Sequence, residues 1–271
     1  MNRYRFADGT AVVTGAAGGI GASLASGLAQ RGSHLVLLDR DAERLAQVVQ
    51  ALRSAHPQLS VHSLVVDLAD RDATDRAGAQ LAAEHPETTL LVNNAGVALV
   101  GRFDEVTLAE FDWLIDINFR AVVTLTHHLL PVLRSHPGAH LANVSSVYGL
   151  IAPAGQAAYV SSKFAVRGFT DALRHELKGD PGVTCVHPGG IATRIAATAR
   201  HGSGVDPVKA AAGLKHFERL LTISPDTAAD AILRGIERRR ARVLIGWTAR
   251  VPDVIGRITP SSYNRLLARL T

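Results

Sequence analysis

The chain of 271 residues has one cysteine, one methionine and few aromatic residues, which make up 5% of it. A single cysteine excludes a disulfide bond within the chain, so Cys185 is expected to be a small buried residue and the compartment a reducing one, the cytoplasm. No apolar run approaches the length of about 18 residues that a membrane-spanning helix needs. The first residues also lack an apolar signal core, so the sequence predicts neither a membrane span nor secretion.

The net charge of the chain is small and unevenly distributed. It amounts to +5, from 29 Lys and Arg against 24 Asp and Glu. Residues 234–271 carry nine arginines against Glu237 and Asp253, a net +7, which leaves the rest of the chain at −2. Most of the protein therefore lacks the positive surface that nucleic-acid binding needs, and a small-molecule partner is expected instead.

Short apolar runs alternate with helical patterns along the chain. Strands alternating with helices predict a parallel sheet with helices on both faces. We expect one α/β domain over residues 1–271, of the doubly wound, Rossmann-like class, with its ligand crevice at the carboxyl ends of the strands. Seven strands are expected, at 10–13, 34–39, 61–66, 90–92, 141–144, 183–186 and 242–245, with the longest helical patterns at about 107–135 and 156–178.

Two segments depart from this alternation. Residues 194–222 hold glycine and proline among many alanines, which predicts a mobile helical flap. Its apolar side chains indicate a lid over an apolar pocket: Ile195, Ala196, Ala197, Leu214 and Phe217. Residues 248–271 form a basic tail, in which one helical face is expected from Val251, Val254, Ile255 and Ile258. We expect this face to pack on its own subunit or on a neighbour; the alternative is peripheral contact with an anionic membrane.

A glycine-rich turn lies between the first expected strand and the first expected helix. Glycine permits a tight turn there and lets the backbone approach a pyrophosphate, which the N–H groups and the dipole of the helix N-terminus attract. Asp39 follows at the end of the next strand, as a dinucleotide site requires. The turn residues expected to hold a dinucleotide are Gly15, Gly18, Gly19, Ile20 and Gly21.

Asp39 and its neighbour Arg40 favour different cofactors. A carboxylate can accept hydrogen bonds from ribose hydroxyls and repels a 2′-phosphate, so Asp39 favours NAD over NADP. Arg40 could pair with that phosphate, which keeps NADP open, although a solvated Arg40 is the simpler interpretation. Asp67, with Leu68, ends the third strand and could reach the adenine; alternatively, Asp67 caps the helix that begins near Asp70.

Tyr159 and Lys163 are four residues apart and share one face of an expected helix. An ammonium beside a phenol favours the phenolate, so Lys163 is expected to lower the pKa of Tyr159 from its usual value near 10. A hydroxyl thirteen residues earlier, Ser146, can then hold the oxygen that the tyrosine protonates or deprotonates. Its neighbour Ser145 competes for this role. A tyrosine and a lysine at this spacing are, on their own, more often an exposed helical pair than a catalytic one. The glycine turn upstream favours the catalytic interpretation here.

With these residues the chain resembles the short-chain dehydrogenase/reductase family over about residues 7–247. The family's turn Thr-Gly-x-x-x-Gly-x-Gly matches at Gly15, Gly19 and Gly21, and its Tyr-x-x-x-Lys at Tyr159 and Lys163. The resemblance implies a catalytic set of Ser146, Asn118, Tyr159 and Lys163. It also implies that NAD or NADP contacts the two segments 93–96 and 188–193 through Asn94, Ala95, Gly96, Pro188, Gly189, Ile191 and Thr193, besides Tyr159 and Lys163.

The resemblance implies oxidation of an alcohol or reduction of a carbonyl, with Tyr159 as acid and base and Asn118 anchoring a water that relays the proton through Lys163. It also implies a homodimer or homotetramer that pairs through the two longest helices, where Leu125, Leu129, Phe164 and Phe169 are candidate contacts; the alternative for some of them is the core. His127 and His128 lack metal-like partners, and no metal is expected. The alternatives are a nucleotide-binding regulatory protein of the same fold and a sugar-nucleotide epimerase, for which the chain is short.

Overall fold

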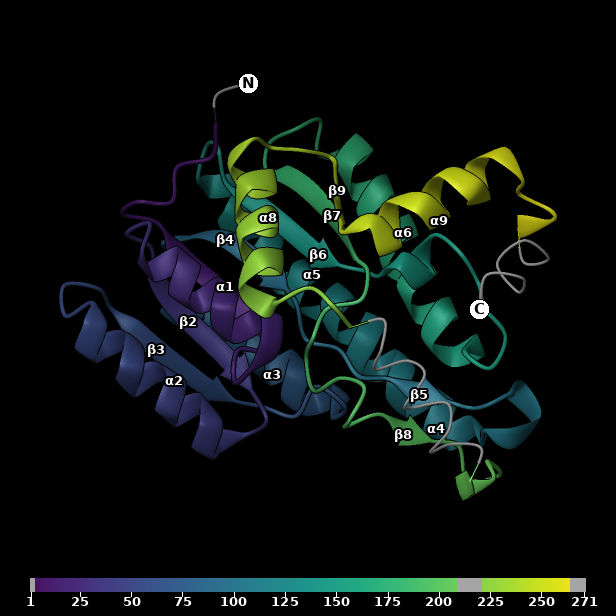
Figure 1. Ribbon diagram of the computed structural model, residues 1–271. Coiled ribbons are helices and arrows are strands. Elements are labelled where there is room, and N and C mark those ends of the chain that lie inside the picture. The colour runs from purple at the N-terminus through teal and green to yellow at the C-terminus, as the bar shows by residue number, and fades with distance from the viewer. Residues whose placement is uncertain (1–2, 209–220, 264–271) are drawn as a thin grey trace.

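The computed structural model describes residues 3–208 and 221–263, and its centre is a parallel sheet of seven strands (Figure 1). The strand order is β3-β2-β1-β4-β6-β7-β9, which confirms the doubly wound class. The order reverses between β1 and β4, so a crevice opens at the carboxyl ends of these two strands. The bounds are β1 Thr10–Thr14, β2 His34–Asp39, β3 Val61–Val65, β4 Thr88–Asn93, β6 His140–Val144, β7 Gly182–Pro188 and β9 Arg242–Ile245.

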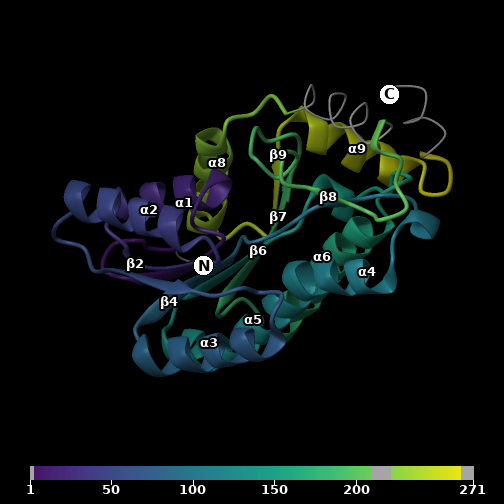
Figure 2. The ribbon, with the colours of Figure 1, turned by 90° about the horizontal axis from the view of Figure 1, so that it is seen from below.

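Helices cover both faces of the sheet because its central strands, β1, β4, β6 and β7, are buried on both sides. Successive strand residues point to opposite faces, so Val13 belongs to one core and Val12 to the other. Figure 2 shows the two layers. One consists of α1 Gly19–Ala29, α2 Ala42–Ala55 and α8 Pro225–Glu237; the other consists of α3 Arg71–Glu84, α5 Ala121–Ser135 and α6 Ala157–Glu176.

Side-chain caps fix where several helices begin. The carboxylate of Asp70 accepts a hydrogen bond from the Ala73 amide and caps α3. The Asp67 carboxylate instead accepts from the Ala69 amide, at 3.0 Å. The interpretation of Asp67 as the cap of this helix is therefore wrong, because Asp70 already satisfies the free amide there.

A π-helical turn interrupts the helix expected over 107–135. The chain runs through α4 Leu108–Ile115, the turn Asp116–Arg120 and then α5. A π turn accommodates one extra residue and changes the direction of the side chains that follow, and such turns are frequent at functional sites. Asn118 lies in this turn and is fully buried.

Two of the proposed interface residues belong to the core. Leu125 and Leu129 on α5 are 1% and 0% exposed and pack beneath the sheet, so they cannot contact a second subunit. Phe169 is partly buried, with its ring centroid 6.2 Å from that of Phe119. Phe164 on α6 is exposed at 37% and is the member of the set that remains available.

The described part of segment 194–222 is not helical over 194–206. It forms turns and a two-residue strand, β8 Arg200–His201, which pairs in parallel with β5 Leu99–Val100. The guanidinium of Arg200 also stacks on the ring of Trp113, at 3.7 Å from its centroid. These contacts hold the segment against β5 and α4. Leu214 and Phe217 lie outside the described residues.

The basic tail begins with α9 Trp247–Ile258, as the periodicity predicts. The helix is anchored by Ala249 and Asp253, its buried residues. Val251, Val254 and Ile258 are 46%, 53% and 74% exposed and Ile255 is half-buried, so the described residues of the subunit cover only part of this apolar face. Packing of the face on a neighbouring subunit stays a prediction. None of the described helices is long and apolar enough to cross a lipid bilayer.

Candidate active site

The glycine turn packs so tightly that two positions admit no side chain. A Cβ on Gly21 would lie 1.9 Å from the Gly15 carbonyl oxygen. Gly15 has φ +68°, and its Cβ would lie 2.9 Å from the Cα of Ala95. The first turn of α1 has no side-chain cap, so its free amide groups can bind an anion.

The loop after β4 is held against this turn by hydrogen bonds. Thr14 Oγ1 accepts from the amides of Asn94 and Ala95, both at 3.0 Å. Asn94 Nδ2 donates to the Thr14 carbonyl at 3.0 Å, so its side chain supports the backbone. Asn93 lies deeper and donates to Thr126 and Asn143, which makes it a structural residue.

A cavity of about 340 Å³ lies beside the turn, at the point where the strand order reverses. Backbone that approaches closely, free amides and a carboxylate on its wall suit a dinucleotide. Twelve of the residues expected to hold one line this cavity: Gly15, Gly18, Gly19, Ile20, Asp39, Arg40, Asp67, Leu68, Asn94, Ala95, Gly96 and Thr193. Its lining does not include Gly21, Pro188, Gly189, Ile191, Tyr159 or Lys163, which were also expected to contact the cofactor.

The wall also includes residues that the sequence motifs did not indicate. Arg194 follows the matched segment, and its Nη2 would lie 3.7 Å from a Cβ on Gly18. It places a cation beside the turn that is expected to hold a pyrophosphate. In the sequence, this contact could have been predicted from the presence of a basic residue directly after Thr193. The other additions are Ala17, Leu38, Asp41, Arg44, Val66, Val97, Ile117 and Thr198. Ile195, which was expected in the lid, also lines the cavity.

The Asp39 carboxylate is oriented by two backbone amides. Oδ2 accepts from Ala17 at 2.9 Å, and Oδ1 accepts from Asp41 at 3.0 Å. Each oxygen keeps a lone pair that can accept a further hydrogen bond from a hydroxyl. Arg40 is exposed at the same end of the cavity, and Arg44 pairs with Asp41 at 3.6 Å.

The four candidate catalytic residues come from three places in the fold. Tyr159 and Lys163 lie on α6, Ser146 follows β6 and Asn118 lies in the π turn. Ser146 lies beside the Tyr159 phenol and acts to lower its pKa. Lys163 Nζ and Asn118 Oδ1 both border Gly96, at 3.2 and 3.4 Å from where its Cβ would be. The structure thus brings the set together at the end of the cavity that Gly96 lines.

The pKa of Tyr159 does not follow the expectation from the sequence. Burial raises it to about 12, opposed by the hydrogen bond with Ser146. Burial also lowers the pKa of Lys163 to about 8. Lys163 Nζ donates to the Val144 carbonyl at 3.1 Å and lies 5.7 Å from the centroid of the phenol ring. The expected lowering by Lys163 is therefore wrong for this structure, because the ammonium binds a carbonyl rather than the phenol oxygen.

The contacts of Asn118 explain the π turn. Its Oδ1 accepts from the Val97 amide at 2.8 Å, and its Nδ2 donates to the Val97 carbonyl at 3.0 Å. The same Nδ2 donates to Ser162 Oγ at 3.2 Å. Asn118 therefore fixes the loop that borders Lys163 to the helix that carries it.

The two candidate serines have different surroundings. Ser145 Oγ is buried and donates to the Lys163 carbonyl at 2.8 Å, so it supports α6. Ser146 contacts the tyrosine, which agrees with its assignment from the spacing. His187, for which packing was the favoured interpretation, is fully buried, and its Nδ1 hydrogen-bonds the Ser146 carbonyl at 3.0 Å. His187 therefore positions the serine, which no spacing in the sequence indicates.

Known proteins are similar to this chain in sequence. The family model described as short chain dehydrogenase matches residues 9–204. SadH of Mycobacterium tuberculosis, described as an oxidoreductase, is 39% identical over 267 residues, covering 97% of this chain and 95% of its own. Dehydrogenase/reductase SDR family member 7B of Xenopus laevis is 33% identical over 239 residues, covering 86% and 72%.

Solved structures have a similar fold along nearly the whole length of this chain. A short-chain dehydrogenase/reductase from Burkholderia phymatum in complex with NAD has a TM-score of 0.84 and 25% identity, covering 95% of each chain. A short-chain dehydrogenase from Sphingobium yanoikuyae in complex with NADPH has a TM-score of 0.77 and 28% identity, covering 93% of this chain and 94% of its own. The chain therefore belongs to the short-chain dehydrogenase/reductase family of oxidoreductases.

Proposed function

We propose that this oxidoreductase interconverts a secondary alcohol and a ketone, with Tyr159 as acid and base. The placement of Ser146 and of the buried Lys163 ammonium beside Tyr159, with Nζ 5.7 Å from the centroid of the phenol ring, is the observation that carries the proposal. A bound NAD or NADP supplies the hydride acceptor or donor and, when oxidised, a positively charged ring. A cation beside Tyr159 lowers the pKa of its phenol, which opposes the effect of burial.

The residues of the chain hold the substrate oxygen and move its proton. Ser146 donates a hydrogen bond to that oxygen, while Tyr159 gives a proton to a ketone or takes one from an alcohol. Lys163 holds the nicotinamide ribose and carries the proton toward solvent with Asn118. The pKa of Lys163, lowered to about 8 by burial, suits a group that exchanges protons near neutral pH.

The cofactor is held by the glycine turn, the loop 94–96 and the segment 188–193. Asp39 accepts hydrogen bonds from the ribose, and Arg194 neutralises the pyrophosphate. The substrate is apolar: Ile195, on the cavity wall, and the buried Ala196 belong to a segment that covers it. The described half of this cover is fixed by the pairing of β8 with β5.

A substrate panel tests the proposal. Cofactor absorbance is followed during turnover with secondary alcohols and ketones of increasing size, at saturating cofactor. Turnover of bulky apolar members and not of polar ones supports the proposal. Cofactor binding without turnover of any member would instead favour the nucleotide-binding regulatory protein.

The same assay measures the cofactor preference. We expect kcat/KM to be at least about tenfold higher with NAD(H) than with NADP(H), a difference of about 1.4 kcal/mol. The reason is that Asp39 is fixed by two amides beside the ribose and repels a 2′-phosphate. Asp39→Ala should narrow the ratio. A preference for NADP(H) in the unaltered enzyme would mean that Arg40 and Arg44 determine the choice.

We also propose assembly into a homodimer or homotetramer through α5 and α6. Phe164 is 37% exposed on α6, and an apolar ring of this kind suits the centre of an interface. Sizing at micromolar concentration should give a dimer or tetramer, and Phe164→Asp should shift it toward monomer. Phe103→Asp, a matched change at a phenylalanine that is 67% exposed and lies outside both helical segments, should leave the size unchanged. A monomeric unaltered protein would refute the assembly.

A further inference from the structure

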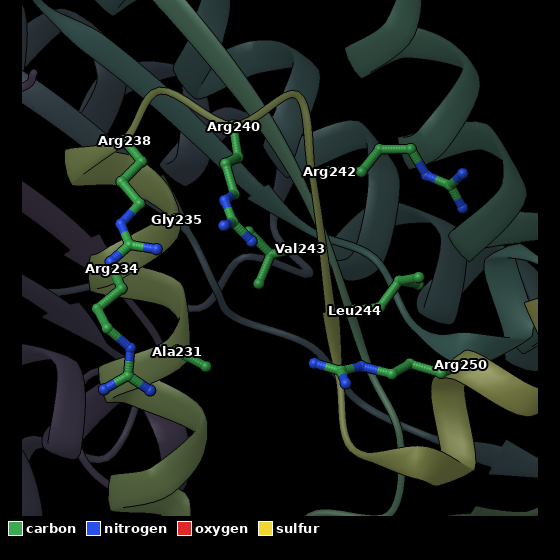
Figure 3. A pocket seen from close by; sticks show the side chains of 9 residues that line it. All are labelled: Ala231, Arg234, Gly235, Arg238, Arg240, Arg242, Val243, Leu244 and Arg250. Atoms are coloured by element: carbon green, nitrogen blue, oxygen red, sulfur yellow. The ribbon is translucent and has the colours of Figure 1, made fainter.

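A second cavity, of about 330 Å³, lies between the end of α8, the strand β9 and the first turn of α9 (Figure 3). Within residues 3–208 and 221–263 it shares no lining residue with the cavity beside the glycine turn. Among the same described residues, five arginines and no acidic residue line it: Arg234, Arg238, Arg240, Arg242 and Arg250. The other lining residues are Ala231, Gly235, Val243 and Leu244. Such a wall attracts anions.

Two of the five arginines have carboxylate partners, and each partner serves a second arginine. Arg234 pairs with Asp230, which also binds Arg31. Arg242 Nη2 donates to Asp253 at 2.8 Å, and Asp253 also binds Arg257. The nearby carboxylates are therefore outnumbered by the arginines that they bind.

The other three arginines have no carboxylate or carbonyl partner for their side chains within residues 3–208 and 221–263. Arg238 ends α8, Arg240 lies in the turn before β9 and Arg250 lies on α9, and all three are exposed. Figure 3 shows Arg240 and Arg250 extending toward the space between α8 and β9, with Arg238 along its α8 side. Three separate elements thus direct guanidinium groups toward one cavity.

A helix dipole explains only part of this arrangement. Cations near the C-terminus of a helix are stabilised by its dipole, which accounts for Arg234 and Arg238. It does not account for Arg240 and Arg250, which come from outside the helix. Guanidinium groups that converge on a concave surface repel one another, and a bound anion relieves that repulsion.

We propose that this cavity binds a ligand that carries two or more phosphate groups. Guanidinium groups match phosphate oxygens with paired hydrogen bonds, and three unpaired ones exceed what a single phosphate neutralises. The ligand is either a free polyphosphate or the headgroup of a phosphorylated lipid. Trp247 and Val251, exposed beside Arg250 on α9, would lie against the lipid in the second case. The site does not depend on the proposed hydride transfer.

Calorimetric titration with inorganic tripolyphosphate tests the site. The triple variant R238Q/R240Q/R250Q should bind at least about tenfold more weakly than the unaltered protein, since one charge-assisted hydrogen bond is worth about that factor. The matched control R76Q/R120Q/R134Q removes the same charge from exposed arginines on α3, in the π turn and on α5, none of which lines the cavity. It should keep the full affinity. The glycine turn is unaltered in both variants, so any tripolyphosphate that it binds contributes equally to both titrations.

Vesicle sedimentation distinguishes the two sources. Phosphatidylcholine vesicles with a multiply phosphorylated phosphoinositide are compared with phosphatidylcholine alone. Sedimentation that the triple variant loses and the control keeps identifies a lipid headgroup, whereas tripolyphosphate binding without sedimentation identifies a free ligand. Equal weakening by the test and control triples, or no binding of either probe by the unaltered protein, overturns the proposal.

Discussion

Replacing Tyr159 by phenylalanine is expected to abolish nearly all turnover and to leave cofactor affinity almost unchanged. The change removes the phenol oxygen that lies beside Ser146 and keeps the ring over which Lys163 Nζ lies. Positioned acid–base groups contribute about 10²- to 10⁴-fold to rate, and Tyr159 is the group proposed to exchange the proton of the substrate. The loss should therefore appear in kcat, with cofactor Kd within about twofold of the unaltered value.

Tyr148→Phe is the matched control for this change. Its ring lies edge-on to that of Tyr159, with centroids 6.0 Å apart, and its side chain makes no hydrogen bond with the described residues. We expect it to keep kcat within about tenfold, below the usual acid–base contribution. If Tyr159→Phe retains more than about a tenth of the turnover, the proton transfer assigned to Tyr159 is wrong.

The strands and the glycine turn could be predicted because their determinants are local. Each strand is a short apolar run, and the turn needs glycine where Gly21 meets the Gly15 carbonyl. The fold class followed from the alternation of strands and helices, which the strand order confirms. The spacing of Ser146 and Tyr159 also selected the serine that contacts the phenol.

Features that depend on distant partners could not be predicted in the same way. Leu125, Leu129 and the apolar face of α9 have the same helical periodicity, yet the first two are buried and that face is exposed. Periodicity reports that one side of a helix is apolar and does not report what covers it. The direction of the Tyr159 pKa likewise depended on burial and on the carbonyl that holds Lys163, neither of which a four-residue spacing specifies.

Two buried histidines are expected to make the fold sensitive to acid. His140 lies in β6, where its Nε2 hydrogen-bonds Thr184 Oγ1 at 2.8 Å, and burial lowers its pKa to about 3. Burial lowers the pKa of His187 to about 4. Neither buried ring has a carboxylate partner among the described residues that would stabilise its charged form.

The direction of this pH effect follows from the number of protons that the folded and the unfolded chain bind. An unfolded histidine has a pKa near 6.5, so between about pH 6.5 and pH 4 the unfolded chain binds more protons than the folded one. The free energy of unfolding must therefore fall as the pH falls through 6.5, and it keeps falling until the folded pKa is reached. Each histidine should lower the free energy of unfolding by about 2 kcal/mol between pH 7 and pH 5, and the pair should lower it by about 4 kcal/mol.

Urea unfolding at pH 7, 6 and 5 measures this loss. The range stays above the usual pKa of exposed carboxylates, near 4, so that histidine titration dominates. His140→Gln and His187→Gln should each reduce the loss by about half, whatever their stability at pH 7, because each removes one group that protonates on unfolding. His175→Gln, at an exposed position on α6, should leave it unchanged. A free energy of unfolding that stays constant from pH 7 to pH 5 would show that neither ring is held neutral by the fold, and His187 would then lose its assignment as the neutral residue that positions Ser146.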